Sequence, residues 1–349
     1  MKTRMDIAQY LEDVRRVASL DLPWERLADR TIAITGATGL IGSFLVDVLA
    51  QKRGQCKVLV LGRSRDRVVK RFPEYQNDGF LSFVEWDASK PAELSLPPYN
   101  MLLHLASNTH PVAYATDPIG TVTLNVLSLN ALLAHAASNG CERFLFASSN
   151  EIYGENRGDV ELFDEKYCGY IDCNSLRAGY PESKRCGEAL CQAYIRQKGL
   201  DVVIARLTRT FGPTALASDT KAISQFFNNA IRGDDIVLKS EGHQYYSYQY
   251  VSDTVSGLLT VLLKGDCAEA YNVADESGDI TLRCLAELIA EQANKKVRFE
   301  LPDVIEKAGF SKVTKARLDG AKLRALGWRP HYDIESAVRR NFKLLSELA

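Results

Sequence analysis

Short apolar runs alternate with helical segments through residues 30–206, and this alternation limits the fold more than any other feature of the sequence. Most runs have four or five residues and are apolar at successive positions, which is typical of strands buried on both faces. Such strands, separated by helices, form a parallel sheet with helices packed on each side, the doubly wound α/β architecture. The expected strands are 31–35, 57–61, 83–86, 101–105, 143–147 and 201–205, and the expected helices between them are 40–53, 119–138 and 180–198.

A glycine-rich segment, Thr35-Gly-Ala-Thr-Gly-Leu-Ile-Gly42, directly follows the first expected strand and opens the first helix. Gly36 permits the tight turn, Gly39 lets the backbone approach a pyrophosphate, and Gly42 lets helix and strand pack closely. The helix N-terminus adds free N–H groups and partial positive charge. The segment therefore predicts a Rossmann-type dinucleotide site. The expected contacts are Gly36, Thr38, Gly39, Leu40, Ile41 and Gly42.

The regular alternation ends near residue 206, and this change divides the chain. We expect an N-terminal helical extension (1–29), a dinucleotide-binding Rossmann domain (30–206) and a smaller α+β substrate-binding domain (207–349), with 245–265 as a candidate return to the Rossmann part. Beyond 206 we expect helices near 219–232, 253–264, 280–293 and 333–347 and strands over 236–239 and 245–250.

Composition excludes several classes of protein. With 349 residues, 46% of them hydrophobic and a net charge of -1, the chain is neither disordered nor strongly basic, so we expect no nucleic-acid partner. It has no uninterrupted apolar run of about 18 residues and no signal-peptide pattern at its N-terminus, so we expect no membrane partner. Eight cysteines without a CxxC pair fit reduced thiols in a cytoplasmic protein, and neither they nor the five histidines have metal-ligand spacing.

The end of the second strand bears on the choice between NAD and NADP. An acidic residue there binds the ribose hydroxyls and disfavours a 2′-phosphate, whereas a basic residue accommodates the phosphate. The sequence is Leu61-Gly-Arg-Ser64, without an acid, so Arg63 gives a slight preference for NADP.

Tyr180 and Lys184 form a Tyr-x-x-x-Lys pair, one helical turn apart and on one helix face. We expect the Lys184 ammonium to favour the Tyr180 phenolate, so that a phenol with an ordinary pKa of about 10 acts as a base near neutrality. Ser148 and Ser149 close the fifth strand, where a hydroxyl can bind the substrate oxygen that Tyr180 deprotonates. The predicted catalytic residues are therefore Tyr180, Lys184 and Ser149, with Glu151 added below.

The glycine spacing, the Ser-Ser strand end and the Tyr-x-x-x-Lys pair together resemble the extended short-chain dehydrogenases/reductases, the NAD-dependent epimerase/dehydratase family, from about residue 30 onward. Within it the chain is most similar to the UDP-glucuronate decarboxylases, through the stretches 104–125 and 167–185. The resemblance implies that Asp87 holds the adenine amino group of the dinucleotide. It further implies cofactor contacts from Ala88, Leu105, Ala106, Ser107, Asn125 and Lys184.

The residues after Ser149 separate activities within this family. The 4,6-dehydratases carry an Asp-Glu pair there, whereas the UDP-glucuronate decarboxylases keep the Glu after a Ser. Here Asn150 precedes Glu151, and an amide is not the general acid that dehydration needs. The resemblance implies oxidation of a nucleotide-linked uronic acid at C4, loss of CO2 and re-reduction by a tightly bound, recycled NAD(P). Glu151 would position the ring or a water that protonates C5.

Several positions of the substrate pocket depart from the decarboxylase pattern. Arg209 replaces an Asn, Thr214 replaces an Arg, and Tyr246 stands where the pattern has another Arg. The arginines that remain to meet an anion are Arg177, Arg185 and Arg209, because a guanidinium forks onto phosphate or carboxylate oxygens. The expected substrate contacts are Ser107, Asn150, Arg177, Arg185, Arg209 and Tyr246.

Three further hypotheses stay open beside a lyase acting on UDP-glucuronate. A nucleotide-sugar 4-epimerase needs the same oxidation and re-reduction; a 4,6-dehydratase is disfavoured by Asn150; and a dinucleotide-sensing module without catalysis is disfavoured by the intact Tyr180 and Lys184. The resemblance also implies a homodimer that pairs through the helices at 119–138 and 180–198.

Overall fold

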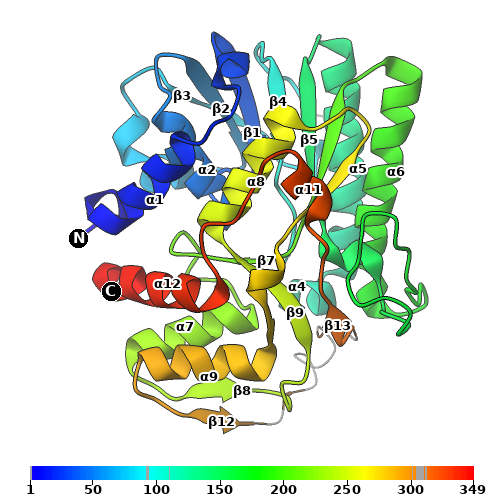
Figure 1. Cartoon of the computed structure of the whole chain (residues 1–349). Helices are drawn as coiled ribbons and strands as arrows, with labels where there is room; N and C mark the ends of the chain where they lie inside the picture. Colours follow the sequence, from blue (N-terminus) through cyan, green and yellow to red (C-terminus); the bar gives the residue numbers. More distant parts are fainter. Residues whose placement is uncertain (1, 92–93, 110, 301, 304–309, 311–312) are drawn as a thin grey trace.

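The computed structural model of the protein describes residues 2–91, 94–109, 111–300, 302–303, 310 and 313–349 (Figure 1). Its centre is a seven-stranded sheet in the order β10-β6-β5-β4-β1-β2-β3, in which every neighbouring pair is parallel. The strands are β1 (Arg30–Thr35), β2 (Cys56–Gly62), β3 (Leu81–Glu85), β4 (Met101–His104), β5 (Arg143–Ser149), β6 (Val202–Leu207) and β10 (Ala270–Val273). The predicted doubly wound α/β fold is confirmed.

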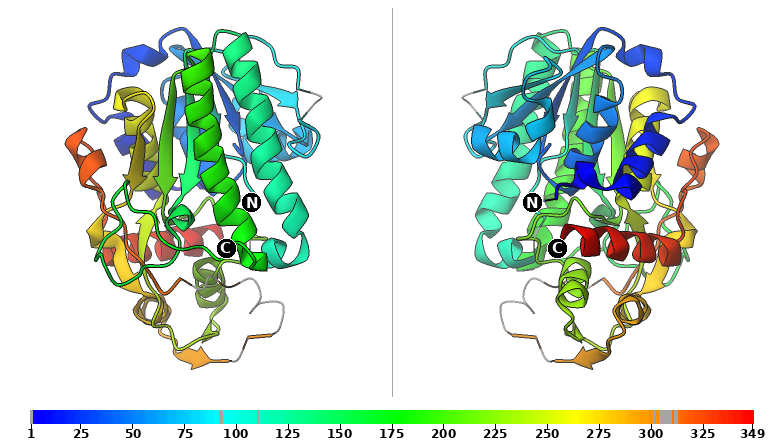
Figure 2. Two further views of the ribbon diagram at one scale, coloured as in Figure 1. Left: turned by 90° about the vertical axis from the view of Figure 1, so that its right-hand side faces the viewer. Right: turned by 90° about the vertical axis from the view of Figure 1, so that its left-hand side faces the viewer.

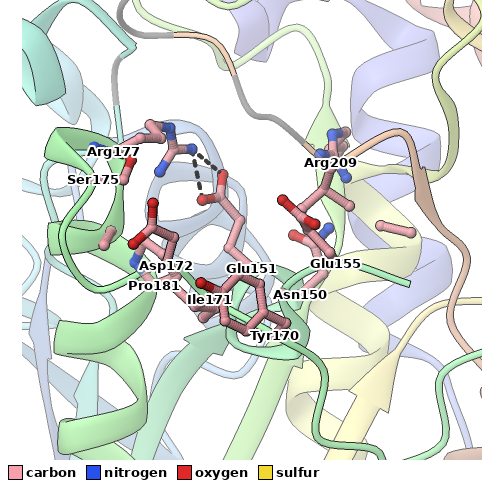
Figure 3. Close-up of a pocket in the computed structure, with 14 residues that line it drawn as sticks. Asn150, Glu151, Glu155, Tyr170, Ile171, Asp172, Ser175, Arg177, Pro181 and Arg209 are labelled. Carbon is pink, nitrogen blue, oxygen red and sulfur yellow. Dashed lines mark hydrogen bonds and ion pairs between the residues drawn. The ribbon is translucent and has the colours of Figure 1, made fainter. Parts of the chain in front are cut away.

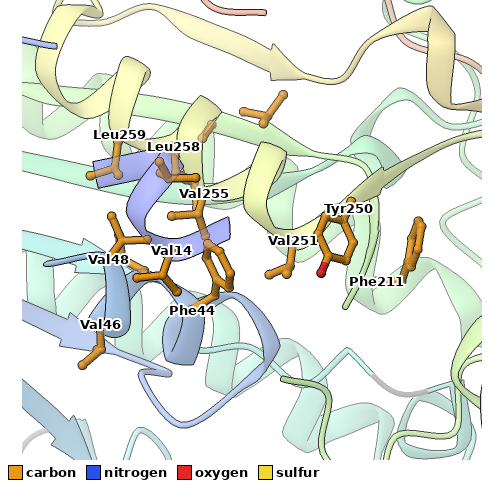
Figure 4. Packing of buried hydrophobic residues seen from close by; sticks show 14 of the residues in the cluster. Val14, Phe44, Val46, Val48, Phe211, Tyr250, Val251, Val255, Leu258 and Leu259 are labelled. Carbon is orange, nitrogen blue, oxygen red and sulfur yellow. The ribbon is translucent and has the colours of Figure 1, made fainter. Parts of the chain in front are cut away.

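Helices cover both faces of this sheet because successive residues of a strand point to opposite sides. Ile32 and Ile34 of β1 lie in one apolar cluster, and Ala33 between them lies in a second. On the first face α2 (Leu40–Ala50) packs against α8 (Val251–Lys264) and α1 (Ala8–Ala18). Figure 4 shows Val14 of α1, Phe44 of α2 and the α8 side chains in one packed layer.

On the second face α5 (Pro118–Ser138) and α6 (Gly179–Lys198) run side by side along the sheet (Figure 2). By length and composition alone, α5 is long and apolar enough to cross a membrane. The sequence did not predict this, because polar residues interrupt the apolar ones along α5. Leu129, Leu132 and Leu133 are nevertheless fully buried in the protein, as in the core helix of a globular domain. Ile119 and Leu127 of α5 are exposed, and the expected dimer through α5 and α6 stays a prediction.

The smaller part of the molecule lies beyond the carboxyl ends of the strands (Figure 1). It contains a mixed sheet of β7 (Arg209–Phe211), β9 (Tyr245–Tyr250), β11 (Asp279–Thr281) and β13 (Lys315–Ala316), and a parallel pair of β8 (Ile236–Leu238) and β12 (Val297–Phe299). The helices of this part are α7 (Ala222–Arg232), α9 (Leu282–Gln292) and α12 (Ile334–Leu348).

The chain crosses between the two parts more often than a single boundary at residue 206 describes. Within the expected return segment 245–265, β9 belongs to the smaller sheet, whereas α8 packs on α2 of the Rossmann part. The chain then adds β10 beside β6, with Tyr271 opposite Ala205, so the seventh strand comes from the region expected to bind substrate. Further short helices are α3 (Arg65–Arg71), α4 (Pro111–Thr116) and α11 (Ala321–Ala325).

Two buried carboxylates fasten the N-terminal segment to the rest of the chain. Asp47 of α2 is fully buried and accepts hydrogen bonds from Arg4 Nε (2.7 Å) and from the hydroxyls of Tyr10 and Tyr75. Asp13 of α1, also fully buried, accepts from the hydroxyl of Tyr250 and from other donors of the smaller part. The extension is therefore an integral part of the core.

We predict that Asp47→Asn lowers the free energy of unfolding by about 3 kcal/mol, because it leaves the buried Arg4 guanidinium without its counter-charge. Urea denaturation of the purified protein measures the change. The matched control is Glu347→Gln, which removes a partly exposed ion pair with Lys2 and should change the free energy by less than about 1 kcal/mol. Equal effects of the two substitutions would show that the buried Asp47 network adds no more to the free energy of unfolding than the partly exposed ion pair.

Candidate active site

A cavity of about 790 Å³ lies between the carboxyl ends of the parallel strands and the smaller part of the molecule. Crevices of this kind, where neighbouring strands lead to helices on opposite faces, are the usual ligand sites of doubly wound folds. The predicted site residues that line it are Gly36, Thr38, Gly39, Leu40, Ile41, Gly42, Arg63, Leu105, Ala106, Ser107, Ser149, Asn150, Glu151, Arg177, Tyr180, Lys184, Arg209 and Tyr246.

Four predicted residues do not line this cavity. Asp87, after β3, caps the next turn by accepting from the Ser89 backbone N–H, and Ala88 lies between these two residues. Asn125 is buried behind the cavity wall, where it accepts from the Ser107 hydroxyl (2.8 Å) and so fixes that side chain.

Arg185 has a structural position that the sequence did not reveal. Its guanidinium donates to the backbone carbonyls of Ile152 (2.7 Å) and Gly169 (2.9 Å), and so ties the segment that follows β5 to helix α6. Arg185 does not line the cavity, and its predicted contact with substrate stays a prediction.

The glycine loop forms a cradle at the end of β1. Gly36 has φ +71°, and a Cβ there would lie 2.8 Å from the backbone nitrogen of Ala106. The Thr35 hydroxyl holds this approach by accepting from the N–H groups of Leu105 and Ala106, each at 3.1 Å. A Cβ on Gly42 would lie 2.3 Å from the Gly36 carbonyl oxygen. The backbone beside the N-terminus of α2 can therefore adopt this conformation only with glycine at positions 36 and 42. The space that it leaves fits the pyrophosphate of a dinucleotide.

Tyr180 and Lys184 enter the cavity from the first two turns of α6, and both are almost fully buried. Lys184 Nζ donates to the carbonyl oxygen of Ala147 at the end of β5 (2.9 Å) and lies 5.9 Å from the centroid of the Tyr180 ring. The carbonyl holds the ammonium at the end of the sheet, beside the phenol, as the sequence pattern predicts.

The charge states of this pair differ from the expectation. Burial, with a smaller contribution from the Glu151 carboxylate, raises the pKa of Tyr180 to about 12, although hydrogen bonding with Ser149 opposes the shift. Burial also lowers the pKa of Lys184 to about 8. Lys184 by itself therefore does not ionise Tyr180 near neutrality, and in the protein alone the phenol is protonated at pH 7.

The two serines at the end of β5 have different tasks. The Ser148 hydroxyl donates to Glu188 (2.6 Å), whose carboxylate is also bound by Arg206, so Ser148 belongs to a structural network. Ser149 accepts from the backbone N–H of Glu151 and begins the short 3₁₀ turn Asn150–Tyr153. Of the two hydroxyls, that of Ser149 is therefore the one placed to meet a substrate oxygen.

Glu151 and Arg177 form an ion pair at the wall of the cavity (Figure 3). One terminal guanidinium nitrogen of Arg177 contacts both carboxylate oxygens of Glu151, at 2.7 and 2.6 Å. The guanidinium carbon also lies 4.4 Å from the centroid of the Tyr114 ring, which in turn lies 5.0 Å from that of Tyr180. Arg177 thus connects the carboxylate to the aromatic pair that contains the predicted base.

Tyr114 and Arg67 are among the cavity-lining residues that were missed as site residues. Tyr114 lies on α4, whose six residues give little helical periodicity to recognise. Arg67 lies on α3, a helix that was not predicted, four residues after Arg63. Ser64 is a good N-cap for this helix, and its hydroxyl accepts from the Arg67 backbone N–H. The Ser-x-x-Arg spacing after a strand was the available signal.

A Rossmann sheet with a glycine cradle and a buried Tyr-x-x-x-Lys pair beside it defines a nicotinamide-dinucleotide-dependent enzyme of the short-chain dehydrogenase/reductase class. Residues 32–274 match the model of the NAD dependent epimerase/dehydratase family, and the chain belongs to that family.

Relatives in this family modify nucleotide-linked sugars. The chain is 31% identical over 313 residues to UDP-glucuronic acid decarboxylase 6 of Arabidopsis thaliana, covering 88% of this chain and 86% of the relative. It is 29% identical over 317 residues to UDP-glucuronic acid decarboxylase 1 of Xenopus tropicalis, covering 89% and 71%. The solved UDP-glucose 4-epimerase of Thermotoga maritima superposes with a TM-score of 0.78 at 23% identity, covering 91% of this chain and 99% of that one, which shows the shared fold.

We predict that the stability difference between the wild type and Lys184→Met depends on pH. The folded state binds the Lys184 proton less tightly than the unfolded chain, in which the lysine has its ordinary pKa of 10.5. Below about pH 8 both states are protonated and the full cost of burying the charge applies; above it the folded state releases the proton and the cost falls. The wild type should therefore gain about 3 kcal/mol relative to the variant between pH 8 and the ordinary lysine value.

Urea denaturation at several pH values measures this difference. Lys198→Met, at the exposed end of the same helix, is the control and should show no such trend. A flat difference for Lys184→Met would mean that the ammonium is not desolvated in the folded protein.

Proposed function

We propose that the protein decarboxylates a nucleotide-linked uronic acid, with UDP-glucuronate as the first candidate substrate. The observation that carries this proposal is the single carboxylate of Glu151 beside Tyr180, held by Arg177 and preceded by the amide of Asn150. The relatives that match along most of the chain are named as UDP-glucuronic acid decarboxylases, which supports the same activity.

The proposed chemistry needs no metal in its bond-breaking step. Removal of a proton and a hydride from the C4 alcohol makes a β-keto acid. Its keto group takes up the electron pair of the C5–C6 bond as CO2 leaves, and a proton then adds at C5. Reduction of the C4 ketone gives the pentose, so the substrate loses CO2 and gains one proton over the whole cycle. The chemistry that a bound nicotinamide dinucleotide supplies is reversible hydride transfer.

The protein's residues have the following proposed tasks in this cycle. Tyr180 takes the proton of the C4 hydroxyl and later returns it, while the Ser149 hydroxyl binds the same oxygen. Lys184, held on the Ala147 carbonyl, stabilises the phenolate during the transfer. Glu151 positions the ring or a water for proton delivery to C5. In the protein without ligands the pKa of the Tyr180 hydroxyl is raised. Ionisation of Tyr180 therefore depends on positive charge that arrives with the ligands.

The experiment is to supply UDP-glucuronate and follow the sugar by proton NMR together with CO2 release. We predict CO2 and a UDP-pentose from the wild type, and a rate lower by about 10²- to 10⁴-fold for Tyr180→Phe. Tyr194→Phe, on the exposed part of the same helix, is the control and should retain the wild-type rate. Inversion at C4 without loss of carbon would identify a 4-epimerase instead, and an unsaturated or 6-deoxy-4-keto product would identify a dehydratase.

We also propose that the dinucleotide is NADP rather than NAD, although solved relatives named as dTDP-glucose 4,6-dehydratases hold NAD. Both Arg63 and Arg67 line the cavity at the end of β2, and the two residues directly after the strand are Arg63 and Ser64 rather than an acid. The hydroxyl of Ser64 caps α3 and is therefore already engaged. Two guanidinium groups at this place favour a 2′-phosphate on the adenosine ribose.

We predict that Arg63→Ala weakens NADP binding about tenfold and changes NAD binding by less than about twofold, because only NADP carries the phosphate. Fluorescence titration of the reduced dinucleotides measures both dissociation constants. Arg65→Ala is the matched control, since the Arg65 guanidinium stacks on Phe83 and does not line the cavity. Tighter binding of NAD than NADP by the wild type would contradict the cofactor assignment.

A further inference from the structure

Arg209 is held against the ring of Tyr246 at the wall of the cavity. The two residues lie on the neighbouring parallel strands β7 and β9, and the Arg209 guanidinium carbon lies 3.5 Å from the centroid of the Tyr246 ring. Tyr246 is 6% exposed, and its hydroxyl donates to the carbonyl oxygen of Val313, so the ring is itself fixed. The stack positions a planar guanidinium at low cost in side-chain entropy.

Several hydrogen-bond donors around Glu151 have no partner. Among the residues that the structure describes, Nη1 of Arg209, Nδ2 of Asn150, and Nε and Nη1 of Arg177 are buried without a hydrogen bond. Figure 3 shows Arg177 and Arg209 on opposite sides of the Glu151 carboxylate, with Asn150 near Arg209. Buried donors without acceptors are costly, so this group of side chains fits a ligand that brings oxygen acceptors.

The charges at this end of the cavity are not balanced within the protein. Arg177 is neutralised by Glu151, and the Lys184 ammonium donates to a backbone carbonyl. In the described ranges Arg209 makes no ion pair, and Asp219, a carboxylate that also lines the cavity, pairs with Lys221. Of the three cations Arg177, Lys184 and Arg209, Arg209 is therefore the one available to an anion from outside the protein.

We propose that Arg209, stacked on Tyr246, is the specificity-determining residue that binds the carboxylate of the sugar, with the Asn150 amide as a second donor. The inference rests on the proposed function, because it assumes a substrate with a carboxylate on C5. It assigns a task to a residue at which this chain departs from the decarboxylase pattern.

The position of Arg209 favours the sugar carboxylate over the diphosphate of the nucleotide. Arg209 and Asn150 lie beside Glu151, in the region where the cavity and the adjoining pocket share their walls. Arg209 is also close enough to Tyr114, the neighbour of Tyr180, to act on its charge. Since Tyr180 acts on C4, a group on C5 lies next to these side chains, whereas the diphosphate on C1 lies across the ring.

Binding is tested in a Tyr180→Phe background, which slows turnover, with the dinucleotide supplied. Calorimetry compares UDP-glucuronate with UDP-xylose, which has the same nucleotide and no carboxylate. We expect Arg209→Gln to weaken the binding of UDP-glucuronate at least about tenfold and the binding of UDP-xylose by less than about twofold. Only UDP-glucuronate loses a charge-assisted contact. Arg196→Gln, at an exposed position of α6, is the control and should change neither constant.

Two variants of Tyr246, on which Arg209 stacks, test the inference independently of any folding defect that Arg209→Gln causes. Tyr246→Phe keeps the ring and should retain the preference for UDP-glucuronate, whereas Tyr246→Leu removes the stacking surface and should reduce it. In the active background Arg209→Gln should raise KM for UDP-glucuronate and leave kcat within about twofold, since the contact exists before the carboxylate leaves.

Equal weakening of both ligands by Arg209→Gln would overturn the assignment in favour of diphosphate binding, and no weakening would overturn it entirely. A wild type without preference for UDP-glucuronate over UDP-xylose would overturn it too, even if CO2 is released. Conversely, a carboxylate preference that depends on Arg209 without any CO2 release would leave this inference standing and contradict the proposed decarboxylation.

Discussion

The close approach of two backbone segments at the end of β1 determines where the other parts of the site lie. Gly36 contacts the backbone of Leu105 and Ala106, and Thr35 holds that contact with its hydroxyl. β1 lies between β2 and β4 in the sheet, so the chain diverges to opposite faces at this point. The dinucleotide cradle, the ends of β4 and β5 and the first turn of α6 therefore open into one cavity, and the smaller part of the molecule closes it.

Burial has opposite consequences for the two central groups of this cavity. It keeps Tyr180 protonated and makes the Lys184 ammonium easier to deprotonate, so the resting protein does not hold a ready phenolate. The base is expected to form only when ligands add positive charge and hydrogen-bond donors. The negative charge of Glu151 disfavours the Tyr180 phenolate. The ion pair between Glu151 and Arg177 reduces this repulsion. The ion pair thus influences the charge state of Tyr180.

The sequence predicted the fold class, because strand–helix alternation and the glycine loop are local patterns. Most of the residues that it predicted for the site line the cavity, because they follow strand ends or lie one turn apart on α6. It did not predict β10 or α4, which are too short for periodicity to distinguish them. Whether an arginine contacts substrate or backbone carbonyls depends on tertiary packing, so Arg185 could not be separated from Arg177 by spacing. The pKa of Tyr180 likewise depends on burial, which a Tyr-x-x-x-Lys motif does not report.

In the proposed function, Tyr180 removes a proton from a sugar alcohol at C4 while the dinucleotide is reduced and later reoxidised. The absorbance of reduced nicotinamide in a single turnover, after rapid mixing of the dinucleotide-loaded protein with UDP-glucuronate, reports this step. We expect the signal to rise, CO2 to appear no earlier than the rise, and the signal then to fall as product forms. Product formation without any transient reduction, or a lasting reduced form with the sugar carbon skeleton unchanged, would contradict it.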